Sequence, residues 1–351
     1  MNKFWLIALV CWQFPSLAAI NSTALDRAMQ ATPLRSEFTG VAAVAQQGQL
    51  LWHFAGREGQ HRPLTLLDTF TIASQSKQMT ATLILQAVDQ HKLTLDTPLS
   101  AVLPARAARF SEPILIRHLL SHSAGVVNTE QPLQFKPGQQ FAYSNGGYEL
   151  LGEVLAQVHG RAYAEVAGEL FATCQMFRTV VPTATQPTSQ VPRLVQGMME
   201  RNGQRQKAPL DDDDRFAASG RIVSSASDLL QFMHCLHETP LLSQQSHQQM
   251  VQPYFARKHR FGALYYGFGL QVSNIEGLTE WSHSGYVDGY ISTTLYYPHT
   301  RLSVVLLEPL SLTPDDMDRV FYYHDQLRQA LRAQLLAGAI SPVLSNEAIL
   351  R

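Results

Sequence analysis

Ser74-Gln75-Ser76-Lys77 stands where a turn is expected to open an amphipathic helix. In a helix, residues three apart lie on one face about one turn apart, so the Lys77 amine can reach the Ser74 hydroxyl. A serine hydroxyl becomes a good nucleophile when a neighbouring base takes its proton, and a lysine can be that base if burial or nearby cations lower its pKa. A second interpretation is a helix-capping serine followed by a solvated lysine. Chance supplies roughly 0.4 such spacings in a chain of this length, so other residues must decide between the two.

The composition is that of a large globular protein. The chain has 351 residues, 45% of them hydrophobic and 16% charged, which is enough to bury a substantial core in one large domain or two lobes. The formal net charge is −1, and the charges form neither a basic stripe nor a basic patch. This balance argues against nucleic acid and against a charged membrane surface as partners.

The first 19 residues have the three-part layout of a secretory signal peptide. Lys3 precedes an apolar run at residues 4–12, and small residues follow at Ser16, Ala18 and Ala19. The run falls short of the ~20 residues that span a bilayer, so we expect cleavage after Ala18 or Ala19 and not a permanent anchor. The mature protein would then be secreted or periplasmic, in a bacterial envelope, with no stable membrane span.

The mature chain keeps two cysteines, Cys174 and Cys235. An oxidising compartment could join them in a disulfide. Two unpaired buried thiols are equally open at this stage, because the sequence does not show whether the two residues approach each other.

Strand patterns occupy both ends of the chain, and helical patterns its middle. The expected strands are at residues 38–46 and 49–54, which flank the turn Gln47-Gly48, and at residues 266–272, 291–297 and 302–308. The expected helices are at residues 22–29, 74–91, 117–120, 147–158, 225–237 and 316–336. This order predicts an α+β fold, with an antiparallel sheet built from both chain ends and flanked by helices, and a mainly helical inserted lobe at about residues 80–220.

We expect one domain over residues 20–338, followed by a C-terminal tail at residues 339–351. The groove of the functional site should lie between the sheet and the inserted lobe. Residues 181–216 read as a long irregular excursion over the surface that ends in the acidic run at residues 211–214. That run is expected to be a solvated loop, with a cation site as the alternative.

Two further short patterns bear on Ser74. Tyr143-Ser144-Asn145 is flanked by Pro and Gly pairs, so it is expected to be a loop whose phenol and amide project into a groove. His283-Ser284-Gly285 is expected to end a strand, with Tyr286 after it, where glycine leaves the backbone accessible.

The ordered set of these three patterns resembles the serine β-lactamase and penicillin-binding protein family. The resemblance extends to Ile72-Ala73, to the stretch at residues 117–125 and to Ala218-Ser219-Gly220, and it covers roughly residues 38–307. It is closest to the class C-like, esterase and D-aminopeptidase branch. The resemblance implies a β-lactamase/transpeptidase-like fold.

By this resemblance Ser74 would be the acylated nucleophile, Lys77 its proton partner, and Tyr143 the second general base or acid. Asn145 would bind the substrate amide. Substrate-binding roles would also fall to His283, Ser284, Gly285 and Tyr286. The oxyanion hole would consist of the backbone N–H groups of Ser74 and Tyr286.

His283 departs from the pattern of many relatives, which carry lysine at this position. A lysine stays cationic at neutral pH and can bind a substrate carboxylate, whereas a histidine with an ordinary pKa of about 6.5 is mostly neutral. We therefore expect weak carboxylate capture and slow or absent β-lactam turnover. Esters or D-amino-acid amides should fit better.

Other functions have less support. His118 and His122 are four apart, a zinc-like spacing, but the sequence lacks the glutamate of a His-Glu-x-x-His motif there. A Gly-x-Ser-x-Gly nucleophile elbow is absent, which argues against an α/β-hydrolase. A non-catalytic sensor that forms a long-lived acyl adduct and a structural envelope protein remain alternatives.

The sequence thus predicts an exported serine hydrolase that cleaves an ester or amide through a Ser74 acyl-enzyme, without a metal or an organic cofactor. An esterase or a D-amino-acid or cell-wall peptidase activity is expected. A β-lactamase or DD-carboxypeptidase proper is the alternative within the family. The expected partner is a small-molecule or peptide substrate, with cell-wall material as one source.

Overall fold

The computed structural model describes residues 20–338, apart from residues 31, 33–34, 59–61, 211–212 and 260–261. The signal peptide predicted at residues 1–19 and the tail predicted at residues 339–351 lie outside the described residues. So do Asp211 and Asp212 of the acidic run, whereas Asp213 pairs with Arg215. None of the described helices combines the length and the apolarity needed to cross a membrane.

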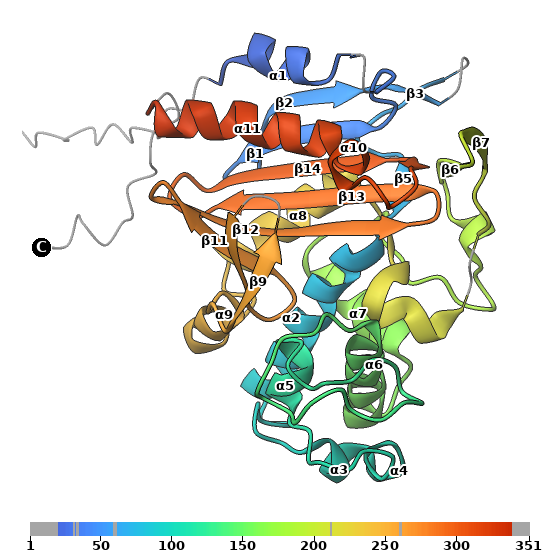
Figure 1. The fold of residues 1–351 in the computed structure, drawn as a ribbon, viewed down its shortest axis with the longest axis vertical. Coiled ribbons are helices and arrows are strands. Elements are labelled where there is room, and N and C mark those ends of the chain that lie inside the picture. The colour runs from blue at the N-terminus through green and yellow to red at the C-terminus, as the bar shows by residue number, and fades with distance from the viewer. Residues whose placement is uncertain are drawn as a thin grey trace, which may run out of the picture.

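The centre of the fold is an eight-stranded antiparallel sheet with the order β2-β1-β14-β13-β12-β11-β10-β9 (Figure 1). Its strands are β1 (Val41–Gln46), β2 (Gln49–Ala55), β9 (Phe255–His259), β10 (Gly262–Tyr266), β11 (Gln271–Ile275), β12 (Leu278–Val287), β13 (Tyr290–Tyr297) and β14 (Leu302–Glu308). The N-terminal hairpin joins the C-terminal strands through β1 and β14, where Val41 pairs with Leu307. The predicted sheet from both chain ends is confirmed.

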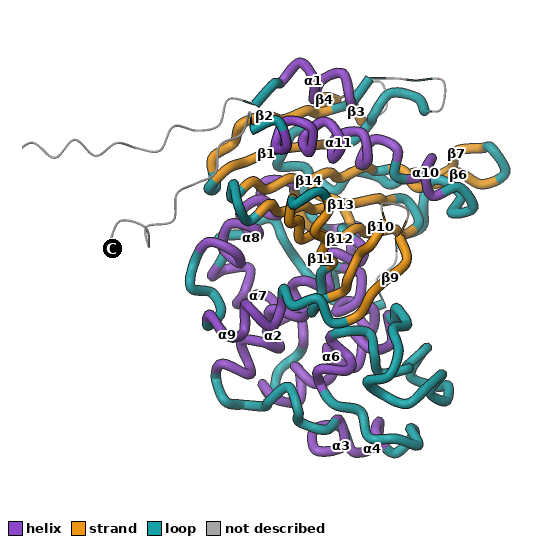
Figure 2. The backbone as a smooth tube through the Cα atoms, turned by 60° about the vertical axis from the view of Figure 1, so that its left-hand side comes forward, coloured by secondary structure: helices purple, strands orange, loops and turns teal. Residues whose placement is uncertain are grey.

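Helices cover both faces of this sheet (Figure 2). Because side chains alternate along a strand, Ala42 and Val44 of β1 pack toward α1 (Ser22–Ala28) and α11 (Tyr322–Leu336). Val41 and Ala43 pack instead into the core shared with α2 (Ser76–Asp89) and α8 (Ala226–Glu238). Strand β1 is buried along its whole length for this reason.

The helical part of the chain lies between β2 and β9. Its other helices are α3 (Leu99–Val102), α4 (Pro104–Ala107), α5 (Ile116–Leu120), α6 (Asn145–His159), α7 (Tyr163–Thr173) and α9 (Gln244–Met250), with the short helical turns η1 (Ala73–Gln75), η2 (Thr188–Gln190), η3 (Asp214–Phe216) and η4 (Ala217–Arg221). Minor strands are β3 (Arg57–Glu58), β4 (Arg62–Pro63), β5 (Thr69–Thr71), β6 (Met198–Arg201), β7 (Gln204–Lys207), β8 (Val223–Ser225) and β15 (Leu310–Ser311), and α10 (Met317–Val320) precedes α11.

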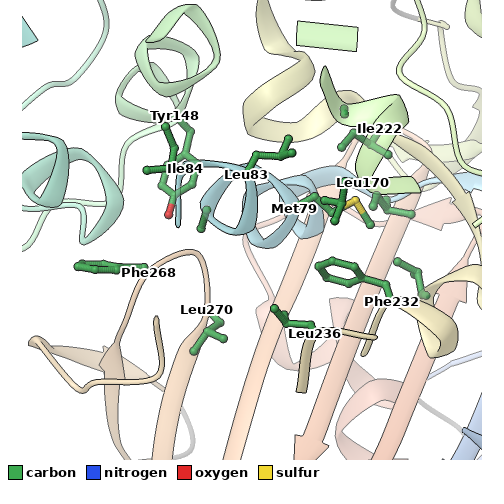
Figure 3. Close-up of a cluster of buried hydrophobic side chains, with 14 of the residues drawn as sticks. Met79, Leu83, Ile84, Tyr148, Leu170, Ile222, Phe232, Leu236, Phe268 and Leu270 are labelled. Atoms are coloured by element: carbon green, nitrogen blue, oxygen red, sulfur yellow. The ribbon is translucent and has the colours of Figure 1, made fainter. Parts of the chain in front are cut away.

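The expected amphipathic character of the helix after Ser74 is wrong. Every residue from 76 to 85 is buried, because the sheet, α6, α7, α9 and η4 surround α2. Figure 3 shows Met79, Leu83 and Ile84 of this helix in the core beside Tyr148 and Leu170. Its polar groups are satisfied internally; Thr80 Oγ1, for example, donates to the Ala218 carbonyl at 2.7 Å.

Several other boundaries differ from the expected ones. The strand predicted at residues 266–272 is two strands, β10 and β11, because the chain reverses at Gly267–Leu270, where the Gly267 N–H donates to the Leu270 carbonyl. Strand β12 continues beyond His283-Ser284-Gly285 to Val287. The last predicted helix is interrupted between α10 and α11.

The excursion predicted to be irregular contains the hairpin β6–β7. Its turn is Asn202-Gly203, whose φ angles of 52° and 73° both lie in the left-handed region. Asn-Gly is the preferred pair for such a turn, so this local signal was present in the sequence. The hairpin was missed because β6 (Met-Met-Glu-Arg) and the exposed, wholly polar β7 lack the alternation of apolar and polar residues that marks a strand.

Cys174 and Cys235 form a disulfide that joins the end of α7 to α8, with 5.6 Å between their Cα atoms. Of the two possibilities that the sequence left open, a disulfide or two unpaired thiols, the structure shows the disulfide. The bridge closes a loop with a sequence separation of 61 residues, which removes chain entropy from the unfolded state.

We predict that reducing the disulfide lowers the free energy of unfolding by about 2–4 kcal/mol, the typical contribution of a disulfide. Denaturant titrations with and without reductant measure the change. The double variant Cys174→Ala/Cys235→Ala is the control, since reductant should leave its transition unmoved. An unshifted wild-type transition, with both thiols shown to be free, would contradict the prediction.

Gly285 sets how closely β12 approaches the turn η1. A Cβ atom at this position would lie 2.5 Å from the Ile72 carbonyl oxygen and 2.4 Å from Ser292 Oγ. Real Cβ atoms do not approach backbone so closely, so another side chain would push the strand away from the turn.

Gly285→Ala should therefore destabilise the protein by about 1–3 kcal/mol through overpacking. Gly168→Ala is the matched control, because an added Cβ there meets nothing within 4 Å and Gly168 lies inside α7. That variant should gain about 0.5–1 kcal/mol from the helix preference of alanine. Equal effects of the two substitutions in thermal or denaturant unfolding would refute the packing argument.

Candidate active site

Ser74 is the middle residue of η1, a turn that is firmly held in place. Ala73 has a φ of 49°, an unfavourable conformation for a residue other than glycine, so surrounding contacts must fix it. Ser76 Oγ donates to the Ala73 carbonyl at 2.8 Å, and Ser292 Oγ of β13 donates to the Ile72 carbonyl at 2.6 Å. These bonds give Ser74 a defined position between α2 and the sheet.

Two glutamines connect this turn to the sheet. Gln75 Nε2 donates to the His283 carbonyl of β12 at 2.7 Å, and Thr294 Oγ1 of β13 donates to Gln75 Oε1 at 2.8 Å. Gln78 Nε2 donates to Thr294 Oγ1 at 3.0 Å. The network is buried, and sequence reasoning missed it because single glutamines carry no pattern.

Lys77 lies under Ser74 with its amine fully buried. Its Nζ donates to Ser74 Oγ at 3.1 Å, to Asn145 Oδ1 at 2.8 Å and to the Ser219 carbonyl at 2.5 Å. Burial lowers the pKa of Lys77 to about 7, and the nearby Glu149 carboxylate opposes that change. The contact predicted from the spacing is therefore present. A solvated lysine after a capping serine is excluded, since Ser74 caps neither helical segment.

Tyr143 and Asn145 enter the site from the start of α6. Ser144 caps this helix, with its Oγ accepting the Gly147 N–H at 2.8 Å, so the predicted helix begins two residues earlier, at Asn145. The Lys77 Nζ lies 5.0 Å from the centroid of the Tyr143 ring. Burial raises the pKa of Tyr143 above its ordinary value, although a hydrogen bond with Ser74 opposes the shift and 38% of the residue is exposed.

His122 supports Tyr143 from behind. Its ring centroid lies 4.3 Å from that of Tyr143, and its Nδ1 accepts the Ser144 N–H at 3.1 Å. Burial and the charge of Lys77 hold the pKa of His122 well below its usual value, so the ring is neutral. His118 makes a different contact, since its Nδ1 accepts the Leu115 N–H at 3.2 Å. The rings of His118 and His122 thus accept hydrogen bonds from two separate backbone segments.

His283 is a neutral histidine in a fixed tautomer. Its Nδ1 lies 2.8 Å from the Ser284 carbonyl, which can only accept, so Nδ1 carries the proton and Nε2 accepts the Tyr266 hydroxyl at 2.9 Å. Burial, assisted by the charges of Lys77 and Arg257, lowers the pKa of His283 to about 3. A cation does not form here at physiological pH.

A cavity of about 250 Å³ opens above Ser74. Its lining side chains come from both the helical part and the sheet: Ser74, Tyr143, Asn145, His283, Ser284, Tyr286, Arg257, Gln271, Met317 and Phe321. Six of the eight predicted site residues line it, while Lys77 lies beneath Ser74 and Gly285 lies against the turn. A larger cavity of about 560 Å³ between α6, α7 and η3 contains none of these eight residues.

Four lining residues were missed by the sequence analysis. Gln271 begins β11, Met317 and Phe321 belong to the region of α10, and Arg257 lies on β9. None of them belongs to a motif. Only the pairing of β9 to β12 through two intermediate strands brings Arg257 near Ser74, and local sequence does not specify that pairing.

Comparison with known proteins agrees with this architecture. The model of the β-lactamase family matches residues 25–334. A D-aminopeptidase of Gluconobacter oxydans is 24% identical over 352 residues, and the match takes in 91% of this chain but 62% of the length of that protein. The chain thus spans less than two thirds of this relative.

Two solved structures share the fold. The D-amino acid amidase from Ochrobactrum anthropi SV3, complexed with L-phenylalanine amide, has a TM-score of 0.75 at 22% identity and covers 89% of this chain and 99% of its own. EstCE1, a hydrolase with promiscuous acyltransferase activity, has a TM-score of 0.75 at 20% identity, with 88% and 97% covered. The predicted α+β fold and the predicted assignment to serine hydrolases are confirmed, and the chain belongs to the β-lactamase family.

Proposed function

We propose that this serine hydrolase cleaves small esters or D-amino-acid amides through an acyl-enzyme on Ser74. The observation that carries the proposal is the buried Lys77 amine, 3.1 Å from Ser74 Oγ and with a pKa of about 7. A buried amine of this kind is a base at neutral pH, and a serine hydroxyl beside it is an activated nucleophile.

Lys77 is the better candidate for the base of the acylation step. With a pKa of about 7, roughly half of the Lys77 amines are neutral at pH 7. A phenol whose pKa lies at or above its ordinary value of about 10 is ionised in fewer than roughly one molecule in a thousand. Lys77 would therefore take the Ser74 proton as Oγ bonds to the acyl carbon.

Tyr143 would then act as the acid. It contacts both Ser74 and Lys77, so it can pass a proton to the departing alcohol or amine as the bond to the acyl carbon breaks, and regain one from Lys77. Water then attacks the acyl carbon and gives one proton to the neutral Lys77 amine, by way of Tyr143, and that proton passes to Ser74 Oγ as its bond to the acyl carbon breaks. The released acid and the free Ser74 hydroxyl restore the starting state.

The remaining groups would bind the substrate. Asn145 Oδ1 is occupied by Lys77, which leaves the Asn145 amide N–H groups to donate to an acyl-side carbonyl. The backbone N–H groups of Ser74 and Tyr286 would form the oxyanion hole. The tight approach of Gly285 to Ile72 supports this assignment because it places β12 directly beside the turn that carries Ser74.

Two observations support export and a small substrate. The disulfide favours an oxidising compartment, in line with the signal peptide expected at residues 1–19. The cavity of about 250 Å³ suits a small acyl donor, and the names of the relatives, D-aminopeptidase and D-amino acid amidase, point to D-amino-acid derivatives. The neutral His283 favours these substrates over β-lactams.

A substrate panel with Ser74→Ala tests the proposal. Short p-nitrophenyl esters and D-amino-acid amides should be hydrolysed by the wild type, and Ser74→Ala should lose at least about a thousandfold in rate while keeping its thermal stability. Ser76→Ala is the matched control: it removes a neighbouring serine hydroxyl and should lose stability more than rate, because Ser76 Oγ holds the turn.

The same panel includes a fluorescent penicillin, muropeptide stems and a chromogenic cephalosporin. A stable penicillin adduct without turnover of any substrate would favour a sensor. Cephalosporin hydrolysis at rates typical of dedicated β-lactamases would overturn the preference for esters and amides. If no substrate reacts in a way that depends on Ser74, the result would favour the structural envelope protein over an enzyme or a sensor.

The pH dependence tests the role of Lys77. Because the base must be neutral, kcat/KM for a neutral ester should rise with pH through about 7 and level off above it. Glu149→Gln should move the rising limb to lower pH, since the Glu149 carboxylate raises the pKa of Lys77. A profile that is flat from pH 5 to 9, or a limb that Glu149→Gln leaves unmoved, would argue against Lys77 as the base.

A further inference from the structure

The proposed oxyanion hole depends on the distance between two elements from different parts of the chain. The backbone N–H of Ser74 lies on η1, and that of Tyr286 lies on β12. Two donors stabilise the negative charge of a tetrahedral intermediate together only if both lie about 3 Å from the same oxygen atom. Contacts that join η1 to β12 therefore bear on the rate of the reaction as well as on the fold.

The part of β12 that carries Tyr286 has a neighbouring strand on one side alone. Strand β11 pairs with β12 as far as Ser282, where Gln271 is the partner, whereas β13 continues to pair with β12 up to Val287. Within the described part of the chain, residues 283–287 thus have β13 as their single neighbouring strand. On its other side, the position of this segment must be set by contacts outside the sheet.

Gln75 supplies the hydrogen bond between η1 and the backbone of this segment. Its Nε2 donates to the His283 carbonyl at 2.7 Å. Its Oε1 accepts from Thr294 Oγ1 of β13 at 2.8 Å and from Gln78 Nε2 at 2.6 Å. Gln75 is 1% exposed, so water does not replace a partner that is lost. The amide of the residue directly after Ser74 is therefore bonded to both β12 and β13.

Gly285 limits the same spacing from the opposite direction. A Cβ atom at Gly285 would lie 2.5 Å from the Ile72 carbonyl oxygen, so β12 already touches the turn and has no room to come closer. The bond from Gln75 to the His283 carbonyl resists the reverse movement, in which the strand separates from the turn. The two contacts together fix how far Tyr286 lies from Ser74.

The other buried side-chain bonds between this turn, α2 and the sheet do not reach β12. Ser292 Oγ donates to the Ile72 carbonyl at 2.6 Å, and Gln78 Nε2 donates to Thr294 Oγ1 at 3.0 Å. Both Ser292 and Thr294 belong to β13. Gln78 is 2% exposed and has the same side chain as Gln75, but its bonds go to Gln75 and Thr294. It is therefore a natural reference for the effect of Gln75.

We propose that Gln75 is a positioning residue for the oxyanion hole. Its amide holds the His283 carbonyl, and through β12 it keeps the Tyr286 N–H at the distance from Ser74 that the tetrahedral intermediate requires. This inference rests on the proposed acyl-enzyme reaction and adds a residue to it. Gln75 does not line the cavity, so it acts through the strand and not on the substrate.

Gln75→Met tests the proposal, because methionine matches the length of glutamine and lacks its polar atoms. Acylation and deacylation both pass through a tetrahedral intermediate, so kcat for a p-nitrophenyl ester should fall by roughly tenfold to a hundredfold while KM changes by less than about twofold. Phenylboronic acid forms a tetrahedral anion when its boron takes an electron pair from Ser74 Oγ. Its inhibition constant should rise by a factor similar to the fall in kcat.

Gln78→Met is the matched control, since it removes an equally buried amide that has no bond to β12. It should lower the melting temperature but leave kcat and the inhibition constant within about twofold of the wild-type values. Equal losses of kcat in the two variants would overturn the proposal, because the network would then act on stability alone. A rise in KM without a fall in kcat would overturn it as well.

Hydrogen exchange separates this proposal from the proposed function. Followed by mass spectrometry, the backbone amides of residues 283–287 should exchange at least about tenfold faster in Gln75→Met than in Gln78→Met, because the segment loses its lateral bond and opens locally. If exchange differs in this way but the wild type neither hydrolyses esters nor binds phenylboronic acid, the acyl-enzyme reaction is refuted and the positioning of β12 by Gln75 stands. Equal exchange in the two variants would refute the positioning role whatever the turnover.

Discussion

The burial of the Lys77 amine is the constraint on which the rest of the site depends. A lysine inside a protein is costly unless each N–H finds an acceptor or the amine becomes neutral. Here the acceptors come from three parts of the chain, Ser74 on η1, Asn145 on α6 and Ser219 on η4. These segments must therefore pack together around α2, and the same burial that requires them lowers the pKa of Lys77 to about 7. The packing of these segments and the lowered pKa of Lys77 therefore have the same cause, the burial of the amine.

The sheet supplies the second half of the site through contacts that tolerate little variation. Gly285 lets β12 touch the backbone at Ile72, and Gln75 Nε2 donates to the carbonyl of His283, two residues earlier on the same strand. Ser74 is thus held between a helix that carries its proposed base and a strand that carries its expected oxyanion donor. Since the turn contains Ala73 in a left-handed conformation, the network also stabilises backbone that would relax if it were alone.

Much of this arrangement could be predicted from the sequence, and the limits have physical reasons. The Ser74 and Lys77 contact follows from helix geometry, and the sheet follows from strand patterns at both ends of the chain. The burial of every residue from 76 to 85 in α2 could not be predicted, because its threonines and glutamines read as solvent-facing until their tertiary acceptors are known. Arg257 reaches the site through the strand order β12-β11-β10-β9, which depends on pairings between distant residues.

The placement of charge around Tyr143 affects the proton affinity of Lys77. A permanent cation at position 283 would lie close enough to Lys77 to lower the pKa of Lys77 further, since like charges disfavour protonation. The neutral His283 avoids this. Arg257 contacts the Tyr143 ring at 5.5 Å and Lys77 contacts it at 5.0 Å, so the electron-rich ring interacts favourably with both cations. In the proposed reaction proton transfer depends on Lys77 and Tyr143, and the neutral His283 leaves burial and Glu149 to set the pKa of Lys77.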